Sequence, residues 1–303
     1  MRNTAPKAAR TAITLVVNLA IMLGAANAAS AAPSGSNHSS SAFIAGALGR
    51  AAAHADLTTA APSTTTSGSA ALTGHVDIPL LASKGVKLSD NGQAVMIGLP
   101  GAGSSGAGQK IADGAVVYSS SIPSANAVIP GASGAQFLIT IKDRQASTSY
   151  AYRIQLPSGV FVHIQPDGSA LVLAKDGSFG LKIGKPWAHD ATGRSVPTHY
   201  IVDGTSLVQV INHRQRGVVY PVVADPSFHW WWGGVDIYFT RAETAWVVGV
   251  GLTAISALLP VRYIVAIGLG QLQPEFQNAW RQNKCVVLHD SWVRPSYTGL
   301  YNC

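Results

Sequence analysis

Side chains able to do acid–base or metal chemistry are scattered along this sequence of 303 residues. His189-Asp190 comes nearest to a base beside an orienting carboxylate, but adjacent residues of a strand point to opposite faces. We interpret the pair as part of a surface loop that follows Trp187. The nine histidines show no pairing at a metal-ligand spacing; they are His38, His54, His75, His163, His189, His199, His213, His229 and His289.

Motifs for nucleophilic and cofactor chemistry are also missing from the sequence. It has no G-x-S-x-G elbow, no H-E-x-x-H, no C-x-x-C and no EF-hand loop. Residues 101–106 fit the dinucleotide pattern G-x-G-x-x-G, yet the following residues are too rich in glycine for the helix that would hold a pyrophosphate. We expect a loop there, no cofactor, no metal and no enzymatic activity. A triad assembled from distant residues is the alternative that one sequence leaves open.

Cys285 and Cys303 are the only cysteines, and the chemistry we expect of them is a bond to each other. An even pair of cysteines in an exported chain predicts a disulfide. Closing the loop 285–303 would stabilise the protein by roughly 3 kcal/mol in the chain-entropy model. The loop contains Trp292 and Tyr297, so we expect a compact aromatic tail.

The N-terminal residues predict export. Residues 1–28 have a basic start, an apolar core over 12–23 and small residues that offer cleavage after Ala28 or after Ala31. A retained N-terminal anchor is the alternative. Residues 29–73 are rich in Ala, Ser, Thr and Gly and cannot bury enough surface to offset their ordering entropy. We expect a disordered spacer with one weak helix near 42–55.

Composition favours an extracellular protein and argues against binding to nucleic acid. Only 12% of the residues are charged, against about 25% in an average soluble domain. The formal net charge of +7 includes Arg2, Lys7 and Arg10, and without them 18 basic and 14 acidic residues leave +4. The remaining basic residues form no dense stripe of the kind that neutralises phosphates. We therefore expect no nucleic-acid partner.

The elements that must position any site are short strands, over residues 74–226. Alternation over 150–156 puts Tyr150, Tyr152, Ile154 and Leu156 on one face, and similar runs cover 137–142, 160–165 and 207–211. Between the runs lie dipeptides that accept the positive φ angles of tight turns. Strands at this spacing predict an antiparallel β-sandwich. The turn dipeptides are Asn91-Gly92, Asp113-Gly114, Asp167-Gly168, Asp176-Gly177 and Asp203-Gly204.

Four segments of this region follow one another in a distinctive order: Lys185-Pro-Trp-Ala-His-Asp190, Val196-Pro-Thr-His-Tyr200, Leu207-Val-Gln-Val210 and Tyr220-Pro-Val-Val-Ala-Asp-Pro226. Their order resembles a broad group of secreted actinobacterial proteins of unassigned function. A similar strand occurs in large YD-repeat surface and toxin-delivery proteins. The resemblance covers roughly 136–226 and implies a signal peptide, a β-rich region and a variable tail. It implies no activity.

The last of these segments also has a physical interpretation. Pro221 lacks an N–H, which predicts an edge strand or a position on the non-bonding side. Asp225 precedes a proline and is held extended, so the strand should stop at Asp225-Pro226. We interpret the segment as a structural terminator and not as a site.

Residues 227–303 predict a small helical module. Thr240-Arg-Ala-Glu243 is a capping box, so a helix should begin near Arg241. The apolar run 246–259 ends at Pro260, and a second run, 261–272, ends at Pro274. The two runs predict a helical hairpin. It would either pack on itself under the aromatic run 230–232 or insert into membranes as glycine-rich bacteriocin-like peptides do.

The expected fold is therefore mainly β with a small α-helical C-terminal module: an antiparallel β-sandwich, a helical hairpin and a disulfide-closed tail. The leading functional hypothesis is a secreted, non-catalytic binding or structural protein whose ligand and protein partner the sequence does not name. The alternatives are a membrane-active, toxin-like factor and a cell-wall carbohydrate binder that stacks sugars on Trp187 or the tryptophan run. The residues that we expect on an interaction surface are Trp230, Trp231, Trp232, Trp292 and Tyr297.

Overall fold

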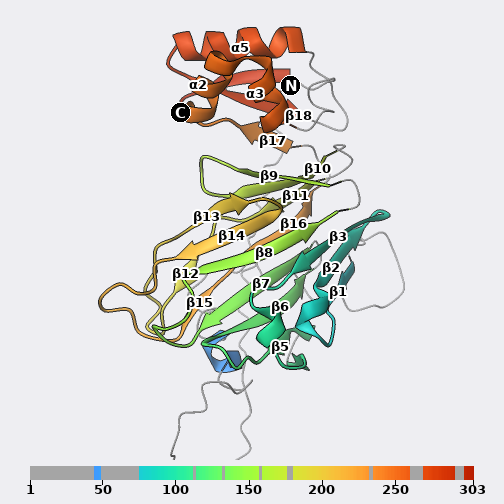
Figure 1. Cartoon of the computed structure of the whole chain (residues 1–303), viewed down its shortest axis with the longest axis vertical. Coiled ribbons are helices and arrows are strands. Elements are labelled where there is room, and N and C mark those ends of the chain that lie inside the picture. Colours follow the sequence, from blue (N-terminus) through green and yellow to red (C-terminus); the bar gives the residue numbers. More distant parts are fainter. Residues whose placement is uncertain are drawn as a thin grey trace, which may run out of the picture. The chain divides into compact units, whose positions relative to one another are not determined.

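The computed structural model of the chain describes residues 44–48, 75–111, 114–131, 134–156, 159–175, 180–231, 235–259, 269–290 and 297–303. Every described residue belongs to the unit Asn37–Cys303. The predicted signal peptide lies outside the described residues, as does all of the predicted spacer except 44–48. The fold is mainly β, with several antiparallel sheets and a few helices (Figure 1).

The first sheet has six strands in the order β1-β2-β3-β8-β14-β13. The Asn91-Gly92 turn joins β2 to β3 with φ angles of 46° and 77°, as the sequence predicts for a tight hairpin. The alternation over 149–155 is equally regular, since every second residue of β8 is buried. The strands are β1 (His75–Asp77), β2 (Val86–Asp90), β3 (Gln93–Gly98), β8 (Ser149–Gln155), β13 (Thr198–Asp203) and β14 (Ser206–Ile211).

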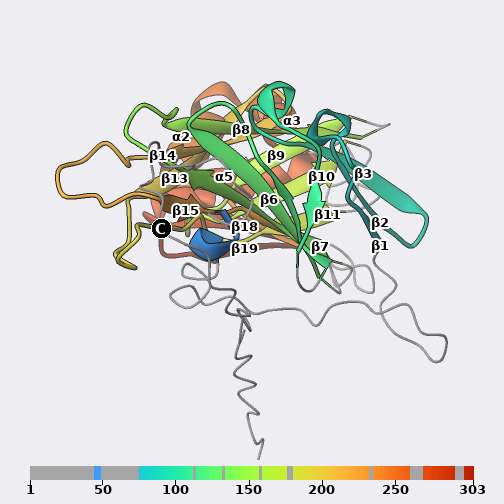
Figure 2. The ribbon, with the colours of Figure 1, turned by 90° about the horizontal axis from the view of Figure 1, so that it is seen from below.

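The second sheet has ten strands, and its main path runs β4-β5-β6-β7-β16-β11-β10-β9. Its longest pairing joins β6 to β7, which lie side by side in Figure 2. The short strand β12 joins this path through β15, which pairs with β7. The strands are β4 (Gln109–Lys110), β5 (Val116–Tyr118), β6 (Ser124–Gly131), β7 (Gly134–Ile141), β9 (Val160–Ile164), β10 (Ala170–Ala174), β11 (Gly180–Ile183), β12 (Ala188–His189), β15 (Val222–Ala224) and β16 (Ser227–Trp231).

Residues of both sheets form one hydrophobic core. Phe137 of β7 meets Tyr152 of β8 edge-on at 6.1 Å and Phe228 of β16 at 5.1 Å. These three rings are fully buried, so they contribute both burial and favourable ring geometry. A second core lies on the other face of the ten-stranded sheet, where helical residues 44–48 cover Val117 and Leu138 through Ile44 and Leu48. The predicted spacer therefore includes one helical turn that packs on the sheet.

The segment around Tyr220 behaves partly as its sequence predicts. Strand β15 ends at Ala224 and β16 begins at Ser227, so Asp225-Pro226 does interrupt the strand. The predicted edge position is wrong, because β15 lies between β12 and β7. The missing N–H of Pro221 causes no conflict, since the proline precedes the first residue of the strand. The chain stays in the ten-stranded sheet beyond Pro226, through Trp231.

The glycine-rich segment 101–106 forms a loop, as expected. Gly101 has a left-handed backbone (φ 59°, ψ 22°) and opens the single-turn 3-10 helix η2 (Ala102–Ser104). A similar single turn, η1 (Ala82–Lys84), precedes β2. Strand β4 follows the loop, so no α-helix is present to hold a pyrophosphate in the way a dinucleotide site requires.

The C-terminal region combines helices with a three-stranded sheet. The helices are α2 (Arg241–Val250), α3 (Leu252–Leu258) and α5 (Leu269–Arg281), and the strands are β17 (Val235–Tyr238), β18 (Cys285–Asp290) and β19 (Tyr297–Tyr301). Thr240 caps α2 through the predicted capping box: its hydroxyl accepts from the Glu243 N–H at 3.2 Å, and its own N–H donates to the Glu243 carboxylate at 2.7 Å.

The predicted helical hairpin differs from the observed helices in two ways. The run 246–259 is not one helix, because Gly251 adopts φ 80° and ψ −146° between α2 and α3. The second helix does not stop at Pro274 but continues to Arg281. Leu272, Phe276 and Ala279 lie on one face of this helix and are fully buried. The burial of this apolar face stabilises the helix more than the one proline destabilises it. Among the described residues, no helix is long and apolar enough to cross a membrane.

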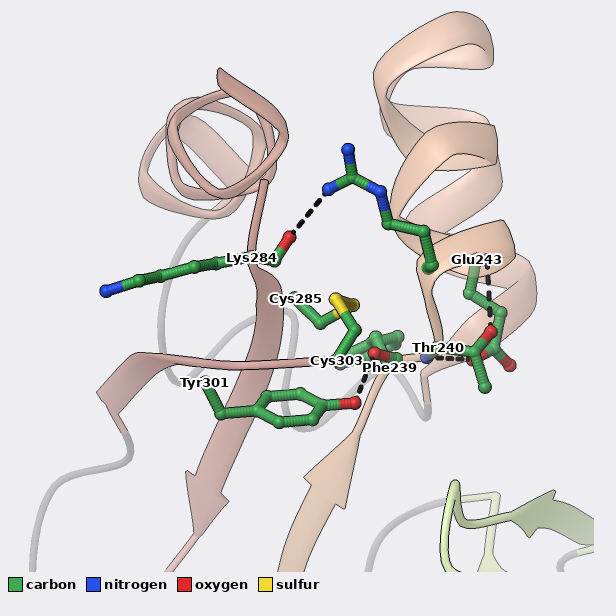
Figure 3. Close-up of a disulfide and its surroundings, with 8 residues drawn as sticks. Phe239, Thr240, Glu243, Lys284, Cys285, Tyr301 and Cys303 are labelled. Carbon is green, nitrogen blue, oxygen red and sulfur yellow. Dashed lines mark hydrogen bonds between the residues drawn. A yellow bond between two sulfur atoms is a disulfide. The ribbon is translucent and has the colours of Figure 1, made fainter. Parts of the chain in front are cut away.

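The predicted disulfide is present. Cys285 of β18 and Cys303 are bonded with their Cα atoms 5.4 Å apart. Beside it the Tyr301 hydroxyl donates to the carbonyl of Phe239 at 2.7 Å (Figure 3). The bond fixes the end of β19 against β18, and the tyrosine ties the same strand to the residue that precedes the cap of α2.

Candidate functional site: a groove beside the C-terminal sheet

The residues predicted for an interaction surface do not come together. Trp230 is 5% exposed in the main core, and Trp231 belongs to β16. Tyr297 is 57% exposed and stacks on His289 of the three-stranded sheet with ring centroids 4.7 Å apart. Trp232 and Trp292 lie outside the described residues. The described members of the set therefore belong to two different sheets.

Two side chains of the ten-stranded sheet hold the C-terminal sheet by its open edge. The Gln165 amide donates to the carbonyl of Asp236 at 2.7 Å, and its oxygen accepts from the N–H of Tyr238 at 3.0 Å. His163 Nε2 lies 2.9 Å from the carbonyl of Tyr238. Strand β17 pairs with β18 on its other side, so Gln165 and His163 satisfy an edge that would otherwise lack partners.

An apolar cluster supports this joint. Leu171 and Leu173 of β10 are buried together with Ile237, Phe239 and residues of the three helices. Phe161 and His163 add aromatic contacts, since the His163 ring lies 5.8 Å from that of Phe239. Burial and edge hydrogen bonds together hold β17 against β9 and β10. The surface between them is therefore built by residues distant in sequence.

A groove of about 820 Å³ opens beside this joint, a volume within the range of small-molecule sites. Two tyrosines from the C-terminal sheet line it, with ring centroids 5.1 Å apart and nearly perpendicular planes. The rest of the lining comes from the turn between β9 and β10, from β10, β11, β16 and β17, and from the two residues that follow β11. The tyrosine and charged side chains of the lining are Tyr238 and Tyr301, Lys182 and Lys185, and Asp167 and Asp236.

Charges of both signs line the groove. Lys185 Nζ lies 3.6 Å from the Asp167 carboxylate, and both side chains are more than half exposed. Burial by itself would raise the pKa of Asp167, but hydrogen bonds from Ser169 and the nearby Lys185 outweigh it and lower the pKa. Desolvation lowers the pKa of Lys182, and the charge of Asp236 opposes that shift. The groove thus carries paired charges and no net excess of either sign among these four.

His229 adds a neutral ring to the lining. Burial lowers the pKa of this histidine below its ordinary value of 6.5, so the ring is uncharged at neutral pH. A neutral imidazole offers one donor and one acceptor. The groove therefore combines tyrosine rings with donor and acceptor groups.

A second hollow of about 580 Å³ lies over β3 and β8 of the six-stranded sheet. Its lining is rich in serine, and Arg153 is its one charged side chain. Tyr150 is the only aromatic residue there, and it is 3% exposed. This hollow offers fewer converging groups than the groove beside the C-terminal sheet.

The predicted surface loop at His189-Asp190 is only partly observed: His189 belongs to β12, and Asp190 is buried at the start of a turn whose Thr192 and Arg194 are exposed. The Asp190 carboxylate accepts hydrogen bonds from the Thr192 hydroxyl and N–H, from the N–H groups of Arg194 and Val219, and from the Arg194 guanidinium. Burial would raise its pKa, but these donors outweigh it and lower the pKa to about 2. His189 Nδ1 lies 3.1 Å from the carbonyl of Gly193 and takes no part in the cluster.

Several other described histidines are bound to structural partners. His213 lies 2.9 Å from both the Tyr220 hydroxyl and the carbonyl of Ser147, and His75 lies 2.7 Å from Asp77. His289 lies 2.9 Å from the carboxylate of Asp236, which also lines the groove. Within the described ranges, no group of three or more His, Cys, Asp or Glu residues is placed to hold a metal ion.

The sequence gives no sign of one buried acid. Asp225 is 2% exposed, and it accepts from the Trp187 N–H at 3.2 Å and from the Gln136 amide at 3.4 Å. Burial raises its pKa to about 8 against the opposing effect of these hydrogen bonds. In the sequence around Asp225, the following proline indicates the end of a strand, but it does not indicate that the carboxyl group is buried.

Comparison with known proteins adds no identification. No protein-family model matches the chain. No curated protein matches it either.

Proposed function

We propose that this protein is a secreted, non-catalytic binding protein whose ligand site is the groove beside the C-terminal sheet. The observation that carries the proposal is the groove itself, about 820 Å³ with tyrosines, lysines and aspartates from both sides of a well-packed joint. In this interpretation an antiparallel β-sandwich is the carrier, and the disulfide-closed module with its helices completes the site. Export is expected from the signal-like residues 1–28.

A binding role agrees with how the titratable residues are used. Asp190 and His213 are tied into structural hydrogen bonds, and Asp225 lies in the buried interior. The groove contains donors, acceptors and rings, and its two aspartates already have charged or polar partners, since Lys185 lies 3.6 Å from Asp167 and His289 lies 2.9 Å from Asp236. Such a lining can orient a ligand without supplying an activated nucleophile.

The test measures binding and turnover on the same sample of the exported chain. A panel of oligosaccharides, peptides and amphiphiles is titrated while amide signals are followed by NMR. We expect a binder to shift the amides of β10, β11 and β17, with no product formed from ester, peptide or glycoside substrates. Turnover abolished by a single substitution would contradict the non-catalytic role. Binding that leaves these three strands unperturbed would contradict the site.

A membrane-active role is the second candidate, because α2 and α3 expose an apolar face. Trp246 is 43% exposed and Val250 is 53% exposed, one helical turn apart. Small residues continue the exposed face at Gly249, Thr253 and Ala257. An aromatic and aliphatic face of this kind suits the membrane interface.

Dye release from vesicles tests this second candidate with the whole exported chain. Release at micromolar protein, reduced by the double substitution Trp246→Ser and Val250→Ser, would support it. Substitution of Tyr297, an exposed aromatic residue outside these helices, by Ser serves as the control and should leave release unchanged. Intact vesicles at micromolar protein would eliminate the candidate.

A further inference from the structure

The groove has a chemistry that selects a class of ligand. Two tyrosine rings line it, and its charged groups are two lysines and two aspartates, of which Lys185 and Asp167 form an ion pair. We propose that the ligand is a neutral oligosaccharide that runs along the groove. This inference rests on the proposed binding function and names the ligand class for the same site.

The paired charges favour hydroxyl groups over ions. A hydroxyl donates one hydrogen bond and accepts others, so it can bind a carboxylate and an ammonium group at the same time. Lys185 and Asp167 present such a pair 3.6 Å apart, and Lys182 and Asp236 line the same groove. An anionic ligand would meet both aspartates and a cationic ligand both lysines. A neutral molecule with neighbouring hydroxyls uses all four groups without an unpaired charge.

The tyrosines account for affinity toward the apolar faces of sugar rings. Tyr301 is fixed by its hydrogen bond to the Phe239 carbonyl, and Tyr238 packs edge-on against it. A ring held in this way loses little conformational entropy when it contacts a ligand. Residues 165–169 lead from β9 to β10 and border the groove, so its rim continues across both sides of the joint.

The groove is open, which favours a chain over a small enclosed ligand. The side chains of Lys185, Asp167 and Asp236 line it while remaining at least half exposed. An oligosaccharide can enter from the side and extend beyond the lining at both ends. Ligands with several linked sugar rings should therefore bind more tightly than single sugars.

Calorimetric titration of the whole exported chain tests the inference. The neutral probes are hexamers of β-1,4-linked glucose, β-1,4-linked N-acetylglucosamine and α-1,6-linked mannose, and the anionic probe is a hexamer of galacturonic acid. We expect at least one neutral hexamer to bind, at least tenfold more tightly than its monosaccharide and than the galacturonate hexamer. Tyr238→Ala should weaken that binding about tenfold, and Tyr238→Phe should change it less than threefold because the ring remains.

Tyr297→Ala is the matched control, because Tyr297 lies on the same strand as Tyr301 but outside the groove lining. It should leave binding unchanged, and near-ultraviolet circular dichroism of each variant confirms its fold. Tighter binding of the galacturonate hexamer, or of a peptide or amphiphile at β10, β11 and β17, would overturn the ligand class and leave the binding function standing. Failure of every probe class to perturb these strands would overturn both.

Discussion

Asp225 should make the stability of this protein fall as pH rises through neutrality. The carboxyl group is buried and its folded-state pKa is about 8, against an ordinary value of 3.8. The folded state therefore holds a proton that the unfolded state has released. Stability from this group is fully present below about pH 4 and is lost as pH rises through the folded pKa near 8.

The size of the effect follows from the gap between the two pKa values. Each unit is worth about 1.4 kcal/mol, so three pH units between pH 5 and pH 8 correspond to roughly 4 kcal/mol. That is a large share of the 5 to 15 kcal/mol by which domains are stable. Burial lowers the pKa of His213 and His229, which contributes in the opposite direction, but both histidines are present in any variant of Asp225.

The perturbation is Asp225→Asn, which keeps the shape and removes the titration. The new amide oxygen can accept from the Trp187 N–H, and the Gln136 amide can turn its oxygen toward the new donor. Urea unfolding followed by tryptophan fluorescence, without reductant, gives the free energy of unfolding at pH 5 and pH 8. The difference between variant and wild type should shift by roughly 4 kcal/mol in favour of the variant. Curves that run parallel between these pH values would refute the assignment of a buried, protonated carboxyl.

Three further predictions concern Asp190, Gln165 and the disulfide. The folded-state pKa of Asp190 is lowered to about 2, so its carboxylate stabilises the folded state above about pH 4, and this stabilisation is lost as pH falls toward 2. Asp190→Asn should therefore lower the free energy of unfolding by about 2 kcal/mol at pH 7 and make the free energy measured by urea unfolding less dependent on pH between pH 4 and pH 2. Gln165→Leu should lower the free energy of unfolding by about 2 to 4 kcal/mol, because it leaves the carbonyl of Asp236 and the N–H of Tyr238 without their partner. Hydrogen exchange should be faster at the amide of Tyr238 in this variant, and the control Gln93→Leu should leave that exchange rate unchanged. Cys285→Ser with Cys303→Ser should lower the free energy of unfolding by roughly 3 kcal/mol and make that free energy insensitive to reductant. A wild-type protein that is no more stable than this double variant in the absence of reductant would contradict a formed disulfide.

Features set by neighbouring residues could be predicted from the sequence. The turn at Asn91-Gly92, the alternation of β8 and the cap at Thr240 each depend on a few adjacent side chains, and all three are observed. The disulfide was predictable because the described chain offers one cysteine pair. Local chemistry was enough in each case.

Features that depend on distant partners could not be predicted in the same way. Strand β17 pairs with β18 across about fifty residues, and no local pattern gives that register. The groove needs Lys182, Asp236 and Tyr301 from three separate segments, so its chemistry is invisible until they are assembled. Asp190 looked like an exposed acid because its donors, from Thr192 to Val219, close around it only in the fold.

The alternation of residues 235–239 is a signal that could have found part of the site. Asp236 and Tyr238 alternate with Ile237 and Phe239, which is the pattern of a strand with one buried face. That reading would have placed the acid and the tyrosine on the same exposed face. Their meeting with the lysines of β11 and its neighbouring turn would still have required the assembled structure.

The way in which Gln165 and His163 hold β17 has an evolutionary consequence. In these hydrogen bonds both side chains contact only backbone carbonyl and N–H groups, which every strand possesses, and no side chain of β17. Substitutions at the exposed positions of that strand can therefore accumulate without breaking these hydrogen bonds, whereas Ile237 and the adjoining Phe239 remain constrained by burial. Gln165 and His163 could therefore bind the open edge of a different C-terminal module in the same way. Such a replacement would change the residues that line one side of the groove and with them the ligand preference.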